Sequence, residues 1–520
     1  MRQAHEVAAV RVAEGTLMAR LPDGALMGRA AFGLATVCAR LLTQPYGAQV
    51  VVLAGSGDNG GDALHAGALL ARRGATVHAI TAGSRTHAGG AAALRRAGGR
   101  FVTPDDPAAP RLIDRADLIL DGLLGIGGHG GLREPQASLA ARAEAAPATV
   151  VAVDLPSGID ADTGEVPGPA VRADVTVTFG TWKPGLLVDP AASLAGLTEL
   201  VDIGLRPVLG EPALVALQSA DVAALLPAPT AESDKYRRGV LGIVAGSDRY
   251  TGAAWLAAGG ALRGGAGMIR LVTAATAAGI VRQQWPEAVI TVIGRDTGGD
   301  TAPADVLKAA GRVQAWTAGP GMGTDDDAAA LLAEVLASDV PVLVDADGLT
   351  LLAAHRDLLP RSGPTLLPPH AGELSRLLGA DRADVEARRL EHVRRAADDL
   401  GVTVLLKGST TVIAAPGAHA PVHVNPTGTS WLATAGSGDV LSGLAGALLA
   451  QGLPAAEAAA VAAYLHGLAG RLAATGEGAG APDLTAGLPG AGDAPAAPIG
   501  AADVVHALPA AIRAVRASAP

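Results

Sequence analysis

A short segment near the C-terminus combines small residues with one carboxylate. The sequence Gly436-Ser437-Gly438-Asp439 precedes an apolar stretch, Val440–Leu449, that we expect to be helical. Backbone amides at a helix N-terminus bind anions when small residues leave them open. A carboxylate just inside such a turn can accept the proton of a hydroxyl that attacks phosphorus. The segment therefore predicts phosphoryl transfer with Asp439 as the base, although it is not a Walker A loop, because no Lys follows the glycines.

Other segments in the same half of the chain carry side chains that suit this chemistry. They supply glycines, carboxylates, one His, one Lys and several hydroxyls. Four of the segments lie just after a predicted strand or between two strands, and the last precedes the segment 436–439. The segments are Gly319–Gly323, Asp345–Leu349, Pro368–Leu374, Lys407–Thr411 and Asn425–Gly428. We expect His370 to contact a substrate and the Lys407 segment to contact a nucleotide phosphate.

A second glycine-rich turn lies in the first half and follows an apolar run. Residues 55–60 have the spacing Gly-x-Gly-x-x-Gly between a predicted strand and helix, which is typical of pyrophosphate-binding turns. The usual dinucleotide fold also has an acidic residue about 20 positions further on, and none ends the next strand here. The turn instead contains Asp58, Asn59 and Asp62. The turn therefore predicts either the binding of a dinucleotide in an unusual manner or the binding of a cation; the alternative is a tight strand–helix turn without a ligand.

Two later strands of the first half also end in polar residues. Asp121 ends one predicted strand, and Asp154 and Ser157 follow another. Because ligands bind at the carboxyl ends of parallel strands, we expect these side chains to lie near Asn59. Several oxygen donors without Cys or His favour a hard cation or an acid/base site.

Short apolar runs that alternate with Ala-rich stretches must position these segments. The alternation is typical of α/β domains with largely parallel sheets covered by helices on both faces. The predicted strands of the first half are residues 50–53, 76–80, 118–120, 150–153 and 175–179. Those of the second half are residues 239–245, 268–273, 289–293, 315–318, 340–344, 365–367, 402–406 and 412–415.

The composition excludes several classes of protein. A chain of 520 residues exceeds one hydrophobic core, so we expect two or three domains. The net charge of −10 argues against nucleic-acid binding. No apolar run reaches the roughly 20 residues that span a membrane, and the charged N-terminus does not resemble a secretory signal. The single cysteine, Cys38, excludes an internal disulfide and fits a cytoplasmic location.

A proline-rich segment separates the two halves. Four prolines and a polar stretch interrupt the strand–helix alternation between Leu205 and Asp234, as in loops and linkers. We therefore predict a first domain over residues 1–210, a linker over 211–230 and a second domain over 231–520.

The first half resembles the NAD(P)HX epimerase family, whose substrates are hydrated NADH and NADPH (NADHX and NADPHX). The resemblance covers about residues 10–205 and rests on Gly57–Asp62, Asp121–Gly127 and Val153–Gly158. It implies a Rossmann-like three-layer αβα domain that binds the hydrated dinucleotide and a potassium ion.

The resemblance also implies roles for individual residues of the first half. Those implied to bind the substrate are Asp58, Asn59, Gly60, Gly61, Asp62, Gly125, Ile126, Gly127, Gly128, His129, Gly130, Gly131 and Asp154. Those implied to coordinate potassium are Asn59, Asp121 and Ser157. From the chemistry of the substrate, Asp154 is the first candidate for the acid/base and Lys183 is the second.

The second half resembles the ribokinase-like superfamily and, within it, the ADP-dependent NAD(P)H-hydrate dehydratases. The resemblance covers about residues 225–515, and the narrower assignment rests on Thr251–Ala254 together with the segments described above. Residues implied to bind the hydrate are Ala253, Gly321, His370 and Asp439. Residues implied to bind the adenine nucleotide are Lys407, Gly408, Ser409, Thr410, Thr411 and Gly438. Magnesium is expected to bridge the phosphates of ADP.

Together, the two resemblances imply a single repair pathway. The first domain interconverts R- and S-NAD(P)HX, and the second dehydrates the S epimer at the expense of ADP, which releases AMP and phosphate. The implied partners are NADHX, NADPHX and ADP, with no nucleic acid or membrane, and a homo-oligomer is expected. One alternative is a ribokinase-like small-molecule kinase with a non-catalytic dinucleotide-binding first domain. In a second alternative, the first domain is only a non-catalytic scaffold. The presence of several polar residues together at its strand ends argues against this alternative.

Overall fold

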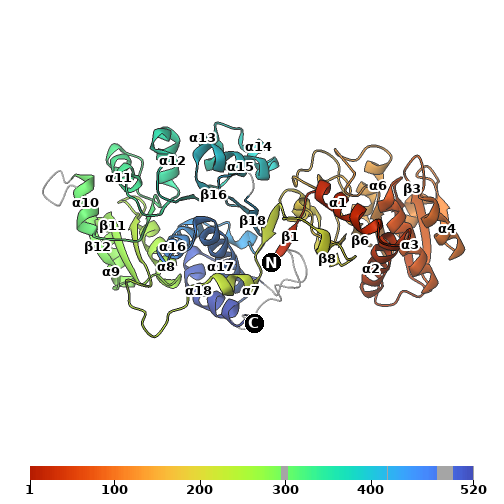
Figure 1. Ribbon diagram of the computed structural model, residues 1–520, viewed down its shortest axis with the longest axis horizontal. Coiled ribbons are helices and arrows are strands. Elements are labelled where there is room, and N and C mark those ends of the chain that lie inside the picture. The colour runs from red at the N-terminus through yellow and green to blue at the C-terminus, as the bar shows by residue number, and fades with distance from the viewer. Residues whose placement is uncertain (294–301, 418–419, 477–495, 519–520) are drawn as a thin grey trace. The chain divides into compact units, whose positions relative to one another are not determined.

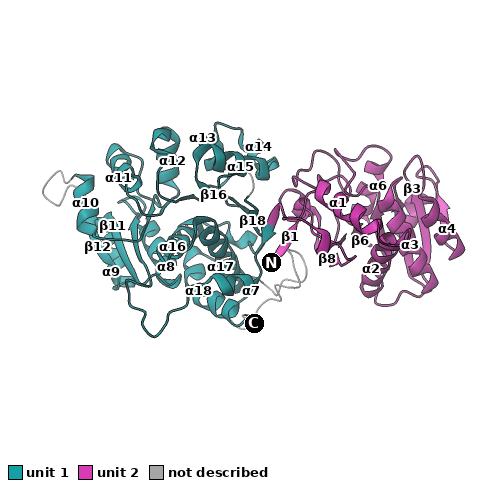
Figure 2. Cartoon of the chain, in the orientation of Figure 1, with its two compact units in different colours: residues 1, 215–485, 492–520 teal, residues 2–214, 486–491 magenta. Residues whose placement is uncertain are grey.

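The computed structural model describes all residues except 294–301, 418–419, 477–495 and 519–520 (Figure 1). The chain forms two compact units, which Figure 2 shows in different colours. The N-terminal unit comprises residues 2–214, and the C-terminal unit comprises Met1 and the described residues from Val215 onward. In the part of the chain that the structure describes, no helix is long and apolar enough to span a bilayer.

The N-terminal unit is built on one parallel sheet. Its strand order is β4-β3-β2-β5-β6-β7-β8, and each neighbouring pair is parallel. The order reverses between β2 and β5, as in Rossmann folds, where ligands bind outside the carboxyl ends of the strands at this point. The strands are β2 (Gln49–Ala54), β3 (Thr76–Thr81), β4 (Arg100–Val102), β5 (Leu118–Gly122), β6 (Thr149–Val153), β7 (Val175–Phe179) and β8 (Leu197–Val201).

Alternate residues of these strands pack into two separate cores. Val50 and Val52 of β2 contact the core formed with α1–α4, whereas Val51 and Leu53 contact the core formed with α5 and α6. Successive side chains of a strand point to opposite faces of a sheet, so helices cover both faces. The helices are α1 (Val7–Met18), α2 (Ala25–Leu41), α3 (Asp58–Arg72), α4 (Ala88–Arg96), α5 (Ala109–Asp114) and α6 (Gln136–Ala145). The expected Rossmann-like three-layer fold is confirmed.

The C-terminal unit contains a larger sheet. Its strands follow the order β18-β17-β16-β15-β14-β13-β10-β11-β12. The pairs from β16 to β12 are parallel, and β17 and β18 add an antiparallel end. The strands are β10 (Val240–Val244), β11 (Met268–Ala274), β12 (Val289–Ile293), β13 (Ala315–Ala318), β14 (Val342–Val344), β15 (Thr365–Leu367), β16 (Thr403–Leu406), β17 (Thr411–Ala414) and β18 (Val422–Asn425).

Helices lie on both sides of this larger sheet (Figure 1). One group forms the main core with the strands: α7 (Ser219–Leu225), α8 (Thr251–Arg263), α9 (Ala275–Gln284), α16 (Ser437–Ala450), α17 (Ala455–Thr475) and α18 (Ala501–Arg516). The other group is α10 (Pro303–Ala310), α11 (Asp326–Leu336), α12 (Asp347–Ala354), α13 (Ala371–Leu378), α14 (Arg382–Ala387) and α15 (Arg389–Leu400). The expected α/β class is therefore confirmed in both units.

Two glycines allow α8 and α16 to touch through their backbones. A Cβ on Gly260 of α8 would collide with the carbonyl of Val440, and one on Gly443 of α16 would collide with the carbonyl of Ala257. Contacts this close exclude any larger side chain. The packing fixes the N-terminal part of α16, and with it Asp439, against the C-terminal half of α8.

The segment 211–230, which we predicted to be a linker, contains regular structure. It includes β9 (Leu214–Ala216) and α7, and the boundary between the compact units falls within β9. Val222 of α7 is fully buried in the core of the C-terminal unit. Apolar residues among the prolines therefore build elements that the proline pattern alone did not predict. The boundaries of the functional domains remain a prediction.

Candidate active sites

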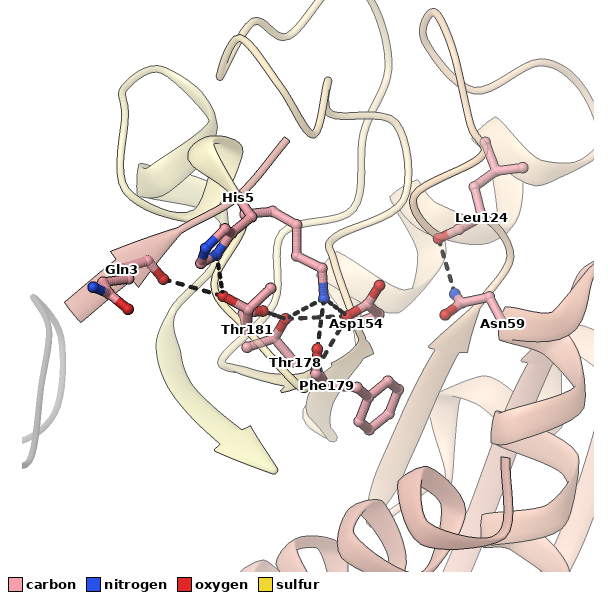
Figure 3. Close-up of polar contacts among 9 residues, drawn as sticks. Gln3, His5, Asn59, Leu124, Asp154, Thr178, Phe179 and Thr181 are labelled. Carbon is pink, nitrogen blue, oxygen red and sulfur yellow. Dashed lines mark hydrogen bonds and ion pairs between the residues drawn. The ribbon is translucent and has the colours of Figure 1, made fainter. Parts of the chain in front are cut away.

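A chain of hydrogen bonds joins three strand-end residues of the N-terminal unit. Asp121 lies at the end of β5, opposite Leu53 on one side and Ala152 on the other. It accepts hydrogen bonds from Ser157 Oγ at 2.6 Å and Ser157 N at 2.8 Å. Leu124 N donates to Ser157 Oγ at 2.8 Å. Figure 3 shows the next bond, in which Asn59 Nδ2 donates to the Leu124 carbonyl at 2.9 Å. The structure therefore brings together Asn59, Asp121 and Ser157, as the sequence predicted.

The surroundings of this cluster suit a cation of low charge density. Asp121 is fully buried, and burial raises the pKa of its carboxyl to about 6 against the opposing hydrogen bonds from Ser157 and Leu123. No Lys or Arg pairs with it among the described residues. The side-chain Nδ2 of Asn59 donates to the Leu124 carbonyl, so its Oδ1 remains available as a metal ligand. The residues thus fit a potassium ion, which would compensate a buried negative charge.

Asp154 and Lys183 form a second, buried group next to the sheet. Lys183 is 1% exposed, and its Nζ lies 2.5 Å from Asp154 Oδ1. The same carboxylate oxygen accepts hydrogen bonds from Thr178 Oγ1 at 3.0 Å and Phe179 N at 3.2 Å (Figure 3). Lys183 also donates to Thr178 Oγ1 and the Phe179 carbonyl, both at 3.0 Å. The two acid/base candidates from the sequence are therefore direct partners, and Thr178 was missed.

The backbone at Asp154 is strained. Its φ of 66° lies in the left-handed region, which costs energy for a residue with a Cβ. Oδ1 is held by three donors, while Oδ2 has no hydrogen bond in the described part of the chain. The strained turn thus holds one carboxylate oxygen fixed and leaves the other available.

Further carboxylates surround the ion pair. Burial, followed by the negative charges of Asp154, Asp58 and Glu14, raises the pKa of Asp62 well above its usual range. Oδ1 of Asp62 is buried without a hydrogen-bond partner. Burial raises the pKa of Glu14 of α1 as well, with Lys183 opposing. The sequence did not predict Glu14, because α1 lies before the first motif that could be recognised.

The glycine loop after β5 runs beside two of these elements. A Cβ on Gly125 would lie 3.0 Å from Asn59 Oδ1, and one on Gly127 would lie 3.3 Å from Arg11 Nη2. The turn at 58–62 and the loop at 125–131 are therefore neighbours, as their proposed common ligand requires. Arg11 was not predicted from the sequence.

In the C-terminal unit, Asp345 organises the predicted phosphate site. It is 1% exposed and follows β14. Its Oδ1 lies 2.8 Å from Lys407 Nζ, and its Oδ2 accepts a hydrogen bond from Ser442 Oγ of α16 at 2.5 Å. Lys407 also lies 3.7 Å from Glu373 Oε2. Burial lowers the pKa of the Lys407 ammonium, but Asp345 and Glu373 raise it by more, so the group stays charged.

Asp439 lies in the first turn of α16, next to this ion pair. A Cβ on Gly438 would lie 3.5 Å from Lys407 Nζ and 3.8 Å from Asp345 Oδ2. Burial and the negative charge of Asp345 raise the pKa of Asp439 to about 7, while Lys407 opposes. A carboxyl with a pKa near neutrality is suited to accept a proton at physiological pH.

His370 caps the helix that follows β15. Its Nδ1 accepts hydrogen bonds from Gly372 N at 3.0 Å and Glu373 N at 3.2 Å. This assigns the proton to Nε2, which lies 3.6 Å from Glu373 Oε1. The ring is half exposed, and burial lowers its pKa. His370 is thus a neutral residue that can donate from Nε2.

The remaining predicted residues fall into two places. Ala253 of α8 and Gly321 lie together, because a Cβ on Gly321 would lie 2.8 Å from Ala253 Cβ. The loop 407–411 joins β16 to β17, and Arg389 supports it by donating to the carbonyls of Lys407 at 3.0 Å and Thr410 at 3.2 Å. Arg389 was missed, since nothing in sequence links a helical Arg to a loop 18 residues away.

A buried histidine was also missed. His466 of α17 lies 2.9 Å from the Ser437 carbonyl, to which its Nε2–H donates. Burial lowers its pKa to about 4, so the ring is neutral. His466 thus fixes the backbone of the anion-binding turn.

Two α/β units, each with a buried Lys–Asp pair near the carboxyl ends of its strands, define an enzyme with two sites. The family model described as NAD(P)H-hydrate dehydratase matches residues 241–487, and the model described as YjeF-related protein N-terminus matches residues 23–185. The chain is 49% identical to the bifunctional NAD(P)H-hydrate repair enzyme Nnr of Mycobacterium leprae, over 92% of this chain and 96% of that protein. It is 50% identical to the enzyme of the same name from Mycobacterium tuberculosis, over 88% of this chain and 92% of that protein.

Among solved structures, the C-terminal unit is similar to the ADP/ATP-dependent NAD(P)H-hydrate dehydratase of Bacillus subtilis. That match has a TM-score of 0.46 and 28% identity, and covers 57% of this chain and 97% of the other. The two Mycobacterium relatives match this chain along nearly their whole length. The chain therefore belongs to the family of bifunctional NAD(P)H-hydrate repair enzymes, which combine an epimerase and a dehydratase for hydrated NADH and NADPH.

Proposed function

We propose that Asp154 is the acid/base of the epimerase in the N-terminal unit. The observation that carries this is the asymmetry of its carboxylate, since Lys183, Thr178 and Phe179 hold Oδ1 and leave Oδ2 without a partner. The substrate carries a hydroxyl on the ring carbon next to the nicotinamide nitrogen. The nitrogen lone pair expels this hydroxyl, and water re-enters the iminium from either face. Asp154 protonates the departing hydroxyl and then deprotonates the entering water.

The loop 125–131 and the turn 58–62 bind the dinucleotide beside this group. Their closeness at Gly125 and Asn59 supports a shared ligand. Asn59, Asp121 and Ser157 hold potassium together with the Leu124 carbonyl, which faces the same cluster. When bound, the ion supplies positive charge that neutralises Asp121 and fixes the loop after β5.

In the C-terminal unit, Asp439 deprotonates the ring hydroxyl of S-NAD(P)HX. That oxygen then takes the terminal phosphoryl group of ADP, which leaves as AMP. The ring nitrogen expels phosphate from the phosphorylated carbon to give an iminium. Loss of a proton from the neighbouring ring carbon to the departing phosphate then forms the ring double bond and regenerates NAD(P)H. A pKa of about 7 at Asp439, beside the charged Lys407, supports this assignment.

The other residues of the C-terminal site position the reactants. The loop 407–411 and Gly438 contact the nucleotide phosphates, whereas Ala253, Gly321 and His370 contact the hydrate. Magnesium would be held mainly by the phosphates of ADP, since the described residues contain no cluster of three His, Cys, Asp or Glu suited to a metal. When bound, it supplies charge neutralisation at the transferred group.

We also propose a cellular location and an oligomeric state for the enzyme. The lone cysteine suits a cytoplasmic enzyme. We expect a homo-oligomer, because Phe32 and Leu41 of α2 and Leu200 of the adjacent edge strand are exposed on the N-terminal unit. Light scattering of the purified chain gives the number of subunits.

The decisive experiment supplies the full chain with a mixed-epimer NADPHX sample and ADP. Complete recovery of the near-ultraviolet absorbance of NADPH is expected, because both epimers pass through one dehydratase. Recovery of only the S fraction would refute the epimerase. Absence of recovery with ADP and with ATP would refute the dehydratase and favour the kinase alternative.

A further inference from the structure

The helix α1 presents two charged residues to the epimerase site. Arg11 and Glu14 are three positions apart and therefore share a helix face. Arg11 Nη2 lies beside Gly127, at 3.3 Å from the position of a Cβ there. Glu14 interacts electrostatically with Lys183 and Asp154. One face of α1 thus borders both the glycine loop and the buried ion pair.

Contacts at the start of α1 keep it in this position. Asp162 Oδ1 accepts a hydrogen bond from Val7 N at 2.7 Å. His5 Nδ1 lies 2.8 Å from Thr181 Oγ1 (Figure 3). His5 N also donates to the Trp182 carbonyl at 3.0 Å. The chain leading into α1 is therefore attached to the same segment that carries Lys183. A change at the N-terminus of α1 would therefore alter the positions of residues in the epimerase site.

The glycine loop offers hydrogen-bond donors next to Arg11. Within the described residues, Gly128 N bonds to the Gly125 carbonyl, but the amides of Gly127, His129 and Gly130 donate to no protein acceptor. Arg11 itself is exposed and forms no hydrogen bond or ion pair there. Open amides beside a free guanidinium suit a phosphate group, which accepts several hydrogen bonds and takes guanidinium in a bidentate manner.

We propose that Arg11 binds a phosphate group of the hydrated dinucleotide while that group rests on the amides of residues 127–130. This rests on the proposed binding of the dinucleotide by the loop 125–131. The group is either the pyrophosphate, which NADHX and NADPHX share, or the 2′-phosphate, which only NADPHX carries. Arg11 is then a binding residue, and the reacting atoms lie at the Asp154 end of the site.

The test measures epimerisation by the full chain without ADP, with R-NADHX and R-NADPHX separately, by chromatographic resolution of the epimers. Arg11→Ala should raise KM at least tenfold and leave kcat within twofold, and Arg11→Lys should recover part of the loss. A rise with both substrates assigns the pyrophosphate, and a rise with R-NADPHX alone assigns the 2′-phosphate. Arg20→Ala, an exposed arginine just past the end of α1, is the matched control and should leave KM unchanged.

Two results would overturn the role of Arg11. One is an unchanged KM with both substrates in an Arg11→Ala chain. The other is a loss of kcat without a rise in KM, which would indicate a structural role of α1. ADP-dependent dehydration of S-NADPHX by the same variant verifies that the chain is folded. If the unaltered chain does not epimerise either substrate, the proposed function of the unit fails instead.

Discussion

The two sites use the same kind of ion pair in different ways. In the N-terminal unit, Lys183 pairs with Asp154, the proposed acid/base itself, at 2.5 Å. In the C-terminal unit, Lys407 pairs with Asp345, and the carboxylate of the proposed base Asp439 forms no hydrogen bond or ion pair among the described residues. Lys183 thus bonds directly to the proposed acid/base. Lys407 instead lies beside the proposed base and opposes burial and Asp345, which raise the pKa of Asp439 to about 7.

Both sites also depend on a non-glycine residue in a left-handed conformation. Asp154 has a φ of 66° after β6, and Ala346, next to Asp345, has a φ of 50° after β14. Such conformations are costly and persist where the surrounding structure enforces them. In each unit the residue with positive φ therefore lies at, or next to, the carboxylate that pairs with a lysine.

The largest effect is expected from Asp439→Asn. This change removes the proposed base and should lower kcat of dehydration by about 10³-fold, within the usual range for general-base catalysis. Binding of ADP, followed by calorimetry, should persist, because the loop 407–411 is unaltered. Epimerisation by the same chain serves as the internal control. Near-normal dehydration by this variant would show that Asp439 is not the base of the C-terminal site.

Asp154→Asn should lower epimerisation by about 10²-fold and leave dehydration of pure S-NADPHX intact. With a mixed-epimer sample and ADP, absorbance should stop rising once the S epimer is consumed. A matched Thr178→Val chain keeps the ion pair but removes one donor to Oδ1. It should lose less activity than Asp154→Asn. Equal loss in both would assign the activity to the network rather than to the carboxylate.

The pH dependence of dehydration should follow the carboxyl of Asp439. With a pKa of about 7, Asp439 is protonated at lower pH and cannot act as a base, so kcat/KM of dehydration should fall about tenfold for each pH unit below 7. Asp345→Asn removes a negative charge that raises this pKa, and the midpoint should therefore move to lower pH. A midpoint that stays in place or moves upward would contradict the electrostatic coupling of Asp345 to Asp439.

The smallest effect is expected from Ser442→Ala. Ser442 Oγ donates to buried Asp345 Oδ2, and loss of such a bond typically costs about 1–3 kcal/mol of stability. Thermal inactivation of dehydration should occur at a lower temperature, while that of epimerisation should be unchanged. A parallel loss of both activities would indicate that the units unfold together.

Sequence patterns located most of the sheet and the principal site residues. The predicted run 315–318 coincides with β13, because a buried parallel strand is a continuous apolar run. β4, which begins at Arg100, and the edge strand β8 were missed, since their exposed residues break that pattern. Asp345 and Lys407 were located, but their mutual bond was not, because 62 residues separate them in the chain.

Residues outside glycine-rich segments were the hardest to predict. Arg11, Glu14, Arg389 and His466 all lie on helices whose local sequence has no feature of a binding site. Their roles arise from tertiary contacts, such as the support that Arg389 gives to the backbone of the loop 407–411. Short-range spacing contains no information on such contacts.

The glycine contact between α8 and α16 has a consequence for how the dehydratase tolerates change. Ala253, which we propose to contact the hydrate, belongs to α8, and Gly438, which we propose to contact the nucleotide phosphates, belongs to α16. The two helices touch through Gly260 and Gly443. One added methyl group at Gly443 would separate the phosphoryl acceptor from its donor without altering any reacting group. The spacing between the two proposed reactants therefore depends on a backbone contact that begins at Val440, the residue next to Asp439, and substitution of either glycine would change the rate of the reaction.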